Sequence, residues 1–386
     1  MRPLTLLLTL AALTATAQAP TWKLGMSTVL SGPSQALGQH MKHGVEAYFA
    51  WKNAAGGVHG RPLELVALDD GYEPARAASN MRTLIDQHQV FSVIGNVRTP
   101  TAAVTVPIAN EKQVPLFGAF TGAGLLRKSP PDRYVVNFRA SYAEETAEMV
   151  RGLVTELGIA PAQLAFFTQN DAYGDAGFNG AVQALKALGY ADAARLPHGR
   201  YPRNTVDVED AVSRLIDPRV RPRAVIMVGA YKPCAKFIKL ARQRGLDALF
   251  VNVSFVGSEA LLRELGPEGD GVVVTQVVPL LDRSTALVKE FEAAVAPDAR
   301  NFISLEGFAA ARAFTVILEA TGPQATRETF LDTLERGVPV DLGFGAPVAL
   351  SPKDHQLSHR VWPTVIRRQR FVPVEQWRSL RGGGVL

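Results

Sequence analysis

Residues 91–121 read FSVIGNVRTPTAAVTVPIANEKQVPLFGAFT, with two short apolar runs on either side of a longer segment. The run 91–95 is typical of a short buried strand of the parallel type, and the run 114–119 predicts another strand. Residues 101–112 between them predict a helix. A strand, a helix and a strand in this order predict a parallel sheet with helices on its faces.

The alternation extends in both directions from this stretch. Strands at 22–30 and 63–68 and helices at 35–53 and 74–88 precede it. A second block follows it, with helices at 146–157, 178–188, 207–216, 235–244 and 259–265 and strands at 163–168, 224–228, 248–253 and 272–278. The two blocks predict an α/β protein with two doubly wound parallel-sheet lobes.

A tail beyond about residue 280 follows the two blocks. It predicts helices at 287–294, 305–320 and 326–336 and strand-like pieces near 348 and at 361–367. Because neither block needs the tail to repeat the pattern, we expect the tail to return and complete one or both lobes.

Length and composition agree with two lobes. The chain has 386 residues, more than the ~250–300 residues beyond which a single core usually divides. Hydrophobic residues make up 47% and charged residues 20% of the sequence. These values do not indicate disorder, and they allow sizeable cores.

The N-terminus has the three regions of a secretory signal peptide. Met1-Arg2-Pro3 is short and positive, residues 4–13 are almost all apolar, and Ala17-Gln18-Ala19 supplies small residues for cleavage. We expect cleavage after Ala19 and a soluble exported protein, because no later segment has ~18 uninterrupted apolar residues. An uncleaved anchor or a buried first helix is the alternative.

Cysteine and charge limit the class further. Cys234 is the only cysteine, which excludes an intramolecular disulfide and favours a buried inert thiol. The formal net charge of +5 includes Arg2, so cleavage would leave +5 − 1 = +4. This mild excess is spread along the chain, and nucleic acid is not an expected partner.

Familiar catalytic motifs are absent. The sequence has no Gly-x-Ser-x-Gly, His-Glu-x-x-His or phosphate loop, and no Gly-x-Gly-x-x-Gly after the first strand. His355 and His359 have helical i,i+4 spacing, but their context predicts a loop and no third ligand is near in sequence. Residues 69–73 lack the ligand spacing of a calcium loop and predict a turn. We therefore expect no catalytic residue, metal or cofactor.

Four loops at the carboxyl ends of predicted strands carry residues suited to small molecules. Open α/β sheets place their ligands at this edge. Thr99 is expected to cap the helix that Pro100 begins, and the N-terminus of that helix suits an anion such as a carboxylate. The loop 118–122 adds the hydroxyl of Thr121 and small residues that let a ligand approach the backbone.

The second block places a tyrosine at each of two equivalent positions. Tyr173 follows the strand 163–168, and Tyr231 follows the strand 224–228. A tyrosine offers an apolar ring and a polar tip, which is useful in a small-molecule site. Taken singly, Thr99 could serve only as a cap and each tyrosine only in packing. Four such loops at equivalent strand ends favour a binding cleft.

With these motifs the chain resembles the periplasmic branched-chain amino-acid binding proteins, the solute receptors of ABC importers with the type I periplasmic-binding fold. The resemblance covers nearly the whole chain after residue 19. It is most specific at 30–33 (LSGP), 53–63 (NAAGGVHGRPL), 69–74 (DDGYEP), 93–95 (VIG), 171–174 (DAYG) and 245–246 (GL).

The resemblance implies a three-crossing hinge that closes two lobes on a ligand. Besides the signal segment 1–19, the implied N-terminal lobe comprises residues 20–139 and 278–355. The implied C-terminal lobe comprises residues 140–277 and 356–386.

The resemblance also implies roles for the strand-end residues. Thr99 and Thr121, together with the backbone at Ala119 and Phe120, would hold a ligand carboxylate. Tyr173 and Tyr231 would cover the ligand from the second lobe.

Two positions depart from the family pattern. Amino-acid binders have an acidic partner for the ligand ammonium after the strand that ends here at 253, where this chain has Ser254. Leu37 replaces an aromatic residue near the first-strand loop. Because a buried ammonium without a carboxylate is costly, we predict a small carboxylate or amide, with an aromatic body as one option, rather than a standard α-amino acid.

We therefore expect a periplasmic, monomeric receptor that delivers its small-molecule ligand to an ABC permease of the inner membrane. The alternative is a periplasmic sensing protein that signals to a membrane sensor domain. An exported hydrolase is a third class, and the missing motifs argue against it.

Overall fold

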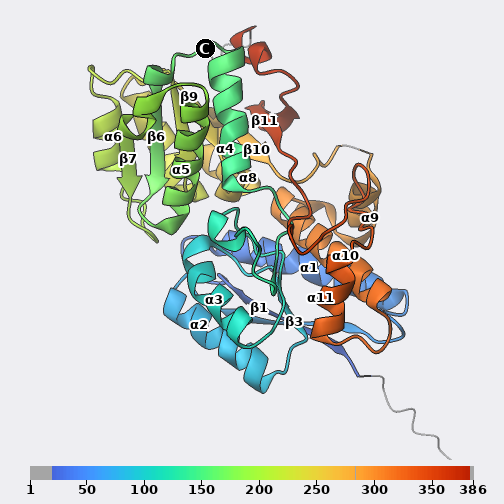
Figure 1. Ribbon diagram of the computed structural model, residues 1–386. Helices are drawn as coiled ribbons and strands as arrows, with labels where there is room; N and C mark the ends of the chain where they lie inside the picture. The colour runs from blue at the N-terminus through green and yellow to red at the C-terminus, as the bar shows by residue number, and fades with distance from the viewer. Residues whose placement is uncertain (1–19, 283, 383–386) are drawn as a thin grey trace, which may run out of the picture.

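The computed structural model describes residues 20–282 and 284–382. Its strands form two sheets in separate halves of the molecule, the lower half containing β1 and β3 and the upper half containing β6, β7 and β9 (Figure 1). No helix within the described residues is long and apolar enough to span a bilayer. The predicted signal segment 1–19 lies outside them.

The first sheet is entirely parallel, with the order β2-β1-β3-β4-β5. Its strands are β1 (Trp22–Thr28), β2 (Leu63–Asp69), β3 (Ser92–Ile94), β4 (Leu116–Phe117) and β5 (Val135–Val136). The connecting helices are α1 (Gln35–Ala54), α2 (Pro74–Arg82) and α3 (Thr99–Glu111). Because the strand order reverses after β2, right-handed crossovers place α1 on one face and α2 and α3 on the other.

The tail returns to this first half. Its helices are α9 (Ala286–Ala294), α10 (Phe302–Thr321) and α11 (Arg327–Glu335), and α10 packs along α1. A Cβ on Gly44 of α1 would lie 2.0 Å from the backbone oxygen of Ser304, so only glycine allows the two helices to come this close. The prediction that the tail completes a lobe is therefore confirmed.

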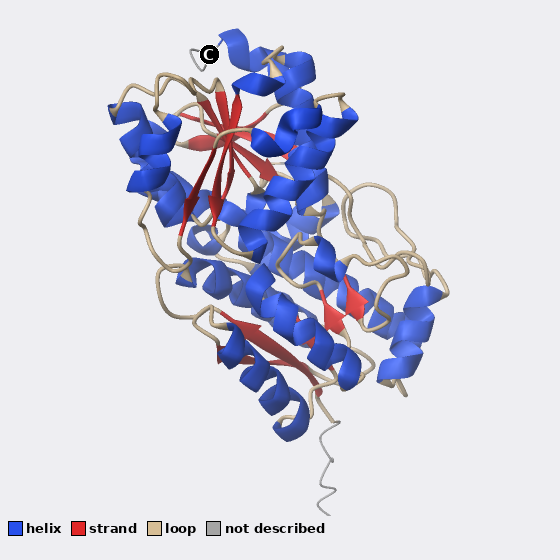
Figure 2. Cartoon of the chain, turned by 60° about the vertical axis from the view of Figure 1, so that its left-hand side comes forward, coloured by secondary structure: helices blue, strands red, loops and turns tan. Residues whose placement is uncertain are grey.

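The second sheet has the order β12-β11-β10-β9-β8-β6-β7, and its strands fan out in the upper half of Figure 2. Its strands are β6 (Leu164–Gln169), β7 (His198–Tyr201), β8 (Ala224–Val228), β9 (Leu249–Asn252), β10 (Val273–Gln276), β11 (Trp362–Arg367) and β12 (Arg370–Pro373). The associated helices are α4 (Tyr142–Val150), α5 (Ala172–Ala187), α6 (Glu209–Leu215), α7 (Tyr231–Gln243) and α8 (Ser258–Leu265). The last two strands pair antiparallel, and the others pair parallel.

The chain passes between the halves after β5, between β10 and α9, and before β11. Two of these passages run together: Asn137 N–H donates to the backbone oxygen of His355 at 2.7 Å, and Leu357 N–H donates to that of Asn137 at 2.9 Å. The lobe boundaries at 139, 277 and 355 stay a prediction.

Several element boundaries differ from the prediction. The strands β5, β7 and β12 were not predicted, and the piece near 348 is only a bridge between Val340 and Val348. The segments 83–87 and 151–156 extend α2 and α4 as wider π-helical turns. The short strands carry too few residues for a pattern of period two to be recognised.

Candidate ligand-binding site

The two predicted threonines meet at the carboxyl ends of β3 and β4. The hydroxyls of Thr99 and Thr121 are hydrogen-bonded at 2.7 Å, and both side chains are buried. Thr99 is the first residue of α3 and Arg98 precedes the helix, so the prediction that Thr99 is the N-cap was wrong. The helix begins one residue earlier than predicted, and this leaves the Thr99 hydroxyl turned to Thr121.

Two backbone N–H groups of the loop after β4 form hydrogen bonds with other backbone groups of the first half. Phe120 N–H donates to the backbone oxygen of Asn96 at 2.7 Å, and Thr121 N–H donates to that of Ala119 at 2.8 Å. The N–H of Phe120 is thus paired within the protein, and the predicted role of the backbone at Ala119 and Phe120 toward a ligand stays a prediction. Its ring instead lies 4.7 Å from that of Phe255, which belongs to the other half.

The predicted tyrosines lie on the facing half. Tyr173 stands in the first turn of α5, and its hydroxyl donates to the backbone oxygen of Gly229 at 3.2 Å. Its ring lies 4.9 Å from Phe255 and 5.3 Å from Tyr142. Tyr173 therefore contributes a ring face, while its polar tip is satisfied within its own half.

Tyr231 is the first residue of α7 and is buried. Burial raises the pKa of its hydroxyl, and the backbone of Ala36 is among the groups that oppose that rise. Because Ala36 belongs to α1 of the first half, Tyr231 lies near both halves. Thr99, Thr121, Tyr173 and Tyr231 thus all lie in the zone where the halves meet.

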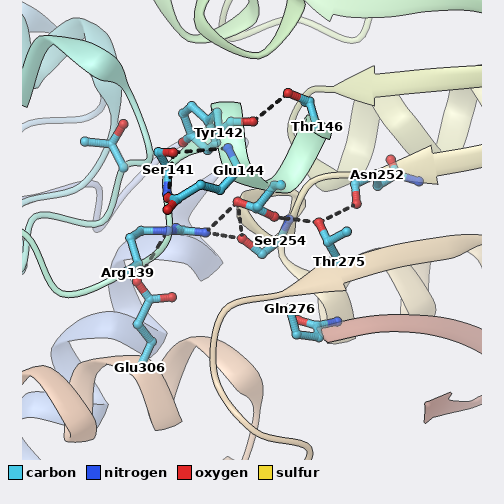
Figure 3. A network of polar contacts seen from close by, with 12 residues as sticks. Arg139, Ser141, Tyr142, Glu144, Thr146, Asn252, Ser254, Thr275, Gln276 and Glu306 are labelled. Carbon is cyan, nitrogen blue, oxygen red and sulfur yellow. Dashed lines mark hydrogen bonds and ion pairs between the residues drawn. The ribbon is translucent and has the colours of Figure 1, made fainter. Parts of the chain in front are cut away.

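Ser254 lies in a buried polar network (Figure 3). Its N–H and hydroxyl donate to Glu145 at 2.7 and 3.0 Å, and Arg139 donates to its hydroxyl. Thr275 donates to Glu145 at 2.5 Å. The side chain of Ser254 is therefore engaged by protein groups.

Arg139 is the positive centre of this network. It lies 3.3 Å from Glu145 of α4 and 3.7 Å from Glu306 of α10, so its charge is shared by carboxylates of the two halves. Burial raises the pKa of Glu306 to about 7, and Arg139 opposes the rise. Sequence reasoning missed both carboxylates, because Glu145 stands 109 residues from Ser254 in the chain.

A cavity of about 550 Å³ opens beside the threonine pair. Thr99, Gly122 and Leu125 line it from the first half, and Tyr142 of α4 and Ala172 and Asn179 of α5 line it from the second. This volume is in the range of small-molecule sites. Within residues 20–282 and 284–382, no group of three or more His, Cys, Asp or Glu residues is placed to hold a metal ion.

Two further sets of contacts join the halves. The hydroxyl of Tyr72, after β2, accepts from Gln169 at 2.6 Å and donates to Asp171 at 3.3 Å. Glu73 accepts from Arg203 at 3.1 Å and from Asn204 at 2.9 Å. These contacts hold the two halves together in a closed arrangement.

Two parallel-sheet halves that meet over a cavity at their strand ends define a solute receptor, and the chain belongs to the periplasmic binding protein family, whose model matches residues 21–370. It is similar to a crystal structure described as a possible leucine/isoleucine/valine-binding protein from Rhodopirellula baltica SH 1. The two are 45% identical with a TM-score of 0.90, and the match covers 95% of this chain and 99% of that chain.

Two other proteins are more distant relatives. The substrate-binding periplasmic protein of Ralstonia solanacearum is 26% identical with a TM-score of 0.81, over 91% of this chain and 99% of that chain. Leu/Ile/Val-binding protein homolog 2 of Brucella abortus (strain 2308) is 25% identical over 74% of this chain and 75% of that protein. The predicted type I periplasmic-binding fold is thereby confirmed.

Proposed function

We propose that this protein captures a small carboxylate or amide between its two lobes in the periplasm and delivers it to an ABC importer of the inner membrane, without chemical turnover. The observation that carries the proposal is the cavity of about 550 Å³ to which the Thr99 side of one half and α5 of the other both contribute. A ligand in such a place stabilises the closed arrangement, because it contacts both halves at once.

The buried network at Ser254 bears on the kind of ligand. The carboxylate of Glu145 already accepts four hydrogen bonds, from Ser254 twice, Thr275 and Arg139. It has no free acceptor for a ligand ammonium. This supports a ligand without an α-ammonium group, whereas the names of the relatives favour a branched-chain amino acid.

A thermal-shift screen against a metabolite panel tests the proposal. A ligand that binds only the folded protein raises its stability by RT ln(1 + [L]/Kd), so about 100-fold excess over Kd adds about 2.7 kcal/mol. We expect carboxylates or amides to raise the melting temperature and leucine, isoleucine and valine to leave it unchanged. Tight leucine binding would refute the ligand class, and recovery of a chemically altered ligand would refute the absence of turnover.

Delivery to a permease needs its own test. Deletion of the gene should abolish uptake of the radiolabelled ligand into cells that otherwise take it up. Normal uptake together with a lost transcriptional response to the ligand would favour the sensing alternative.

A further inference from the structure

The guanidinium of Arg98 is a buried cation that forms no hydrogen bond with the described residues. The residue is 1% exposed, and it lies directly before Thr99 at the carboxyl end of β3. Its three guanidinium nitrogens find no hydrogen-bond acceptor within residues 20–282 and 284–382. Burying an uncompensated charge is strongly unfavourable, so such a group calls for an explanation.

The guanidinium lies between the two halves. Its central carbon is 3.7 Å from the ring centroid of Tyr72, on the first half, and 5.5 Å from that of Phe255, on the second. Burial raises the pKa of Tyr173 and of Tyr231, and the positive charge of Arg98 opposes the rise at both. Arg98 is therefore within electrostatic reach of both predicted cleft tyrosines.

Neighbouring carboxylates are committed elsewhere. Asp70 accepts from Tyr72 N–H and from the Ser27 hydroxyl, each at 2.8 Å. Asp171 accepts from Tyr173 N–H at 3.0 Å and from the Gln169 side chain at 2.6 Å. Across the described part of the chain, neither carboxylate forms an ion pair with Arg98, although the charge of Arg98 opposes the burial that raises the pKa of Asp70. Stacking on Tyr72 stabilises the cation only in part, because it leaves the guanidinium N–H groups unused.

The backbone of Arg98 adds a second unusual feature. Its φ of 89° and ψ of 157° fall in a region that glycine occupies almost alone. A strained backbone and an unpaired buried charge therefore coincide at one residue beside the candidate site. Such strain persists where the surrounding structure enforces it, and it concentrates at functional positions.

We propose that Arg98 binds the anionic group of the ligand, so that this receptor takes a carboxylate anion with an apolar body and rejects the matching neutral amide. The proposal rests on the proposed function and narrows its ligand class. A planar guanidinium can hold a carboxylate through two parallel hydrogen bonds. The rings of Phe255 and Tyr72 beside it suit an apolar body. The hydroxyls of Thr99 and Thr121 can serve an acid or an amide equally well, whereas the charge of Arg98 distinguishes them.

The test uses acid and amide pairs of the same shape: 4-methylpentanoate with 4-methylpentanamide, benzoate with benzamide, and phenylacetate with phenylacetamide. Thermal shift and calorimetry compare wild type, Arg98→Met, Arg98→Lys and the control Arg61→Met. Arg61 also stacks on an aromatic ring, with its guanidinium carbon 3.5 Å from the centroid of Trp22. The control thus removes a stacked arginine that does not belong to the site.

We expect at least one acid to bind wild type about tenfold to a hundredfold more tightly than its amide, the range expected for hydrogen bonds to a charged group. Arg98→Met should abolish this preference, and Arg98→Lys should retain a weaker one. The melting temperatures of ligand-free Arg98→Met and wild type are compared as well, because Arg98 also opposes the burial that raises the pKa of the buried Asp70 carboxylate. Arg61→Met should bind like wild type.

Equal binding of acid and amide by wild type would overturn the inference. The inference would also be overturned if Arg98→Met bound the acid with an affinity within about threefold of wild type. If Arg98→Met does not fold, Arg98→Lys replaces it. Unchanged affinity for the acid and unchanged preference for acid over amide in Arg98→Lys would then overturn the inference. Stabilisation by neutral amides of the broad panel alone would overturn it while leaving the proposed function standing. No stabilisation by any compound would refute the proposed function and the inference with it.

Discussion

The hydroxyl of Tyr72 gives a direct way to measure how much the contacts between the lobes contribute to closure. It accepts from Gln169 at 2.6 Å and donates to Asp171 at 3.3 Å, both across the two halves. Tyr72→Phe removes only this hydroxyl. The variant keeps the ring on which Arg98 stacks, so it separates closure from recognition of charge.

The expected effect follows from the two hydrogen bonds. A neutral hydrogen bond contributes a net ~0.5–1.5 kcal/mol, and the bond to Asp171 is long for its type. We therefore assign about 1–1.5 kcal/mol to the hydroxyl, which is a factor of about 5–10 in the ratio of closed to open protein. Because only the closed form makes these bonds, Kd for the bound ligand should rise by up to that factor.

Calorimetry on wild type and Tyr72→Phe measures this change, with the ligand that the thermal-shift screen identifies. X-ray scattering of the ligand-free proteins should show a larger radius of gyration for the variant. Tyr48→Phe is the matched control, because the Tyr48 hydroxyl is buried and lies 2.7 Å from that of Thr315, within the first half. The control should lose stability but keep its affinity and dimensions. Unchanged affinity and dimensions in Tyr72→Phe would refute the role of this contact in closure.

Three further predictions concern the site, the core and the hinge. Thr99→Ala and Tyr231→Ala should each weaken ligand binding by about 1.5–3 kcal/mol without unfolding the protein. If calorimetry finds the ligand affinity of both variants unchanged, the site is misplaced. Gly44→Ala should lower the free energy of unfolding by about 1–3 kcal/mol in denaturant titrations, because the new Cβ would lie 2.0 Å from the backbone of α10; equal stability would contradict the close packing. Although burial acts in the opposite direction, hydrogen bonds from His359 and Ser141 lower the pKa of Glu144 to about 2, so its contribution to stability is present above pH 4.5 and is lost as the pH falls toward 2. The hydrogen bond with Glu144 is the largest cause that raises the pKa of His359, and Asp354 raises it further. That contribution is present below pH 6.5 and is lost as the pH rises through the raised value. Melting curves of Glu144→Gln should lack the acid change and show a smaller alkaline one.

The fold was predictable where buried runs were long enough to be recognised. Strand β8 lies at Ala224–Val228, as its five apolar residues indicated. Strand β5 comprises only Val135–Val136, so no periodic pattern marked it. Strand β12, at Arg370–Pro373, lies in the most basic stretch of the sequence and pairs antiparallel with β11.

The site was predictable only in part. The position of a residue at a strand end follows from the local sequence, whereas contacts between side chains that are far apart in the chain do not. The positions of Thr99 and Thr121 followed from the order of the strands. The contact between Ser254 and Glu145 joins residues 109 positions apart, and no local pattern in the sequence marks it. Arg98 stood next to Thr99 in the stretch that indicated the site, but its burial depends on a backbone conformation that sequence patterns do not predict for arginine.

Arg139 and Arg98 are both buried near the junction of the two halves, but they differ in whether a carboxylate of the protein balances their charge. Arg139 is also fully buried, yet Glu145 lies 3.3 Å and Glu306 3.7 Å from it. These carboxylates supply its countercharge within the protein, and removing one of them would leave an unbalanced charge. Arg98 has the same burial without such a partner among the described residues. If Arg98 binds the ligand as proposed, the anionic group of the ligand supplies the countercharge that Glu145 and Glu306 supply to Arg139.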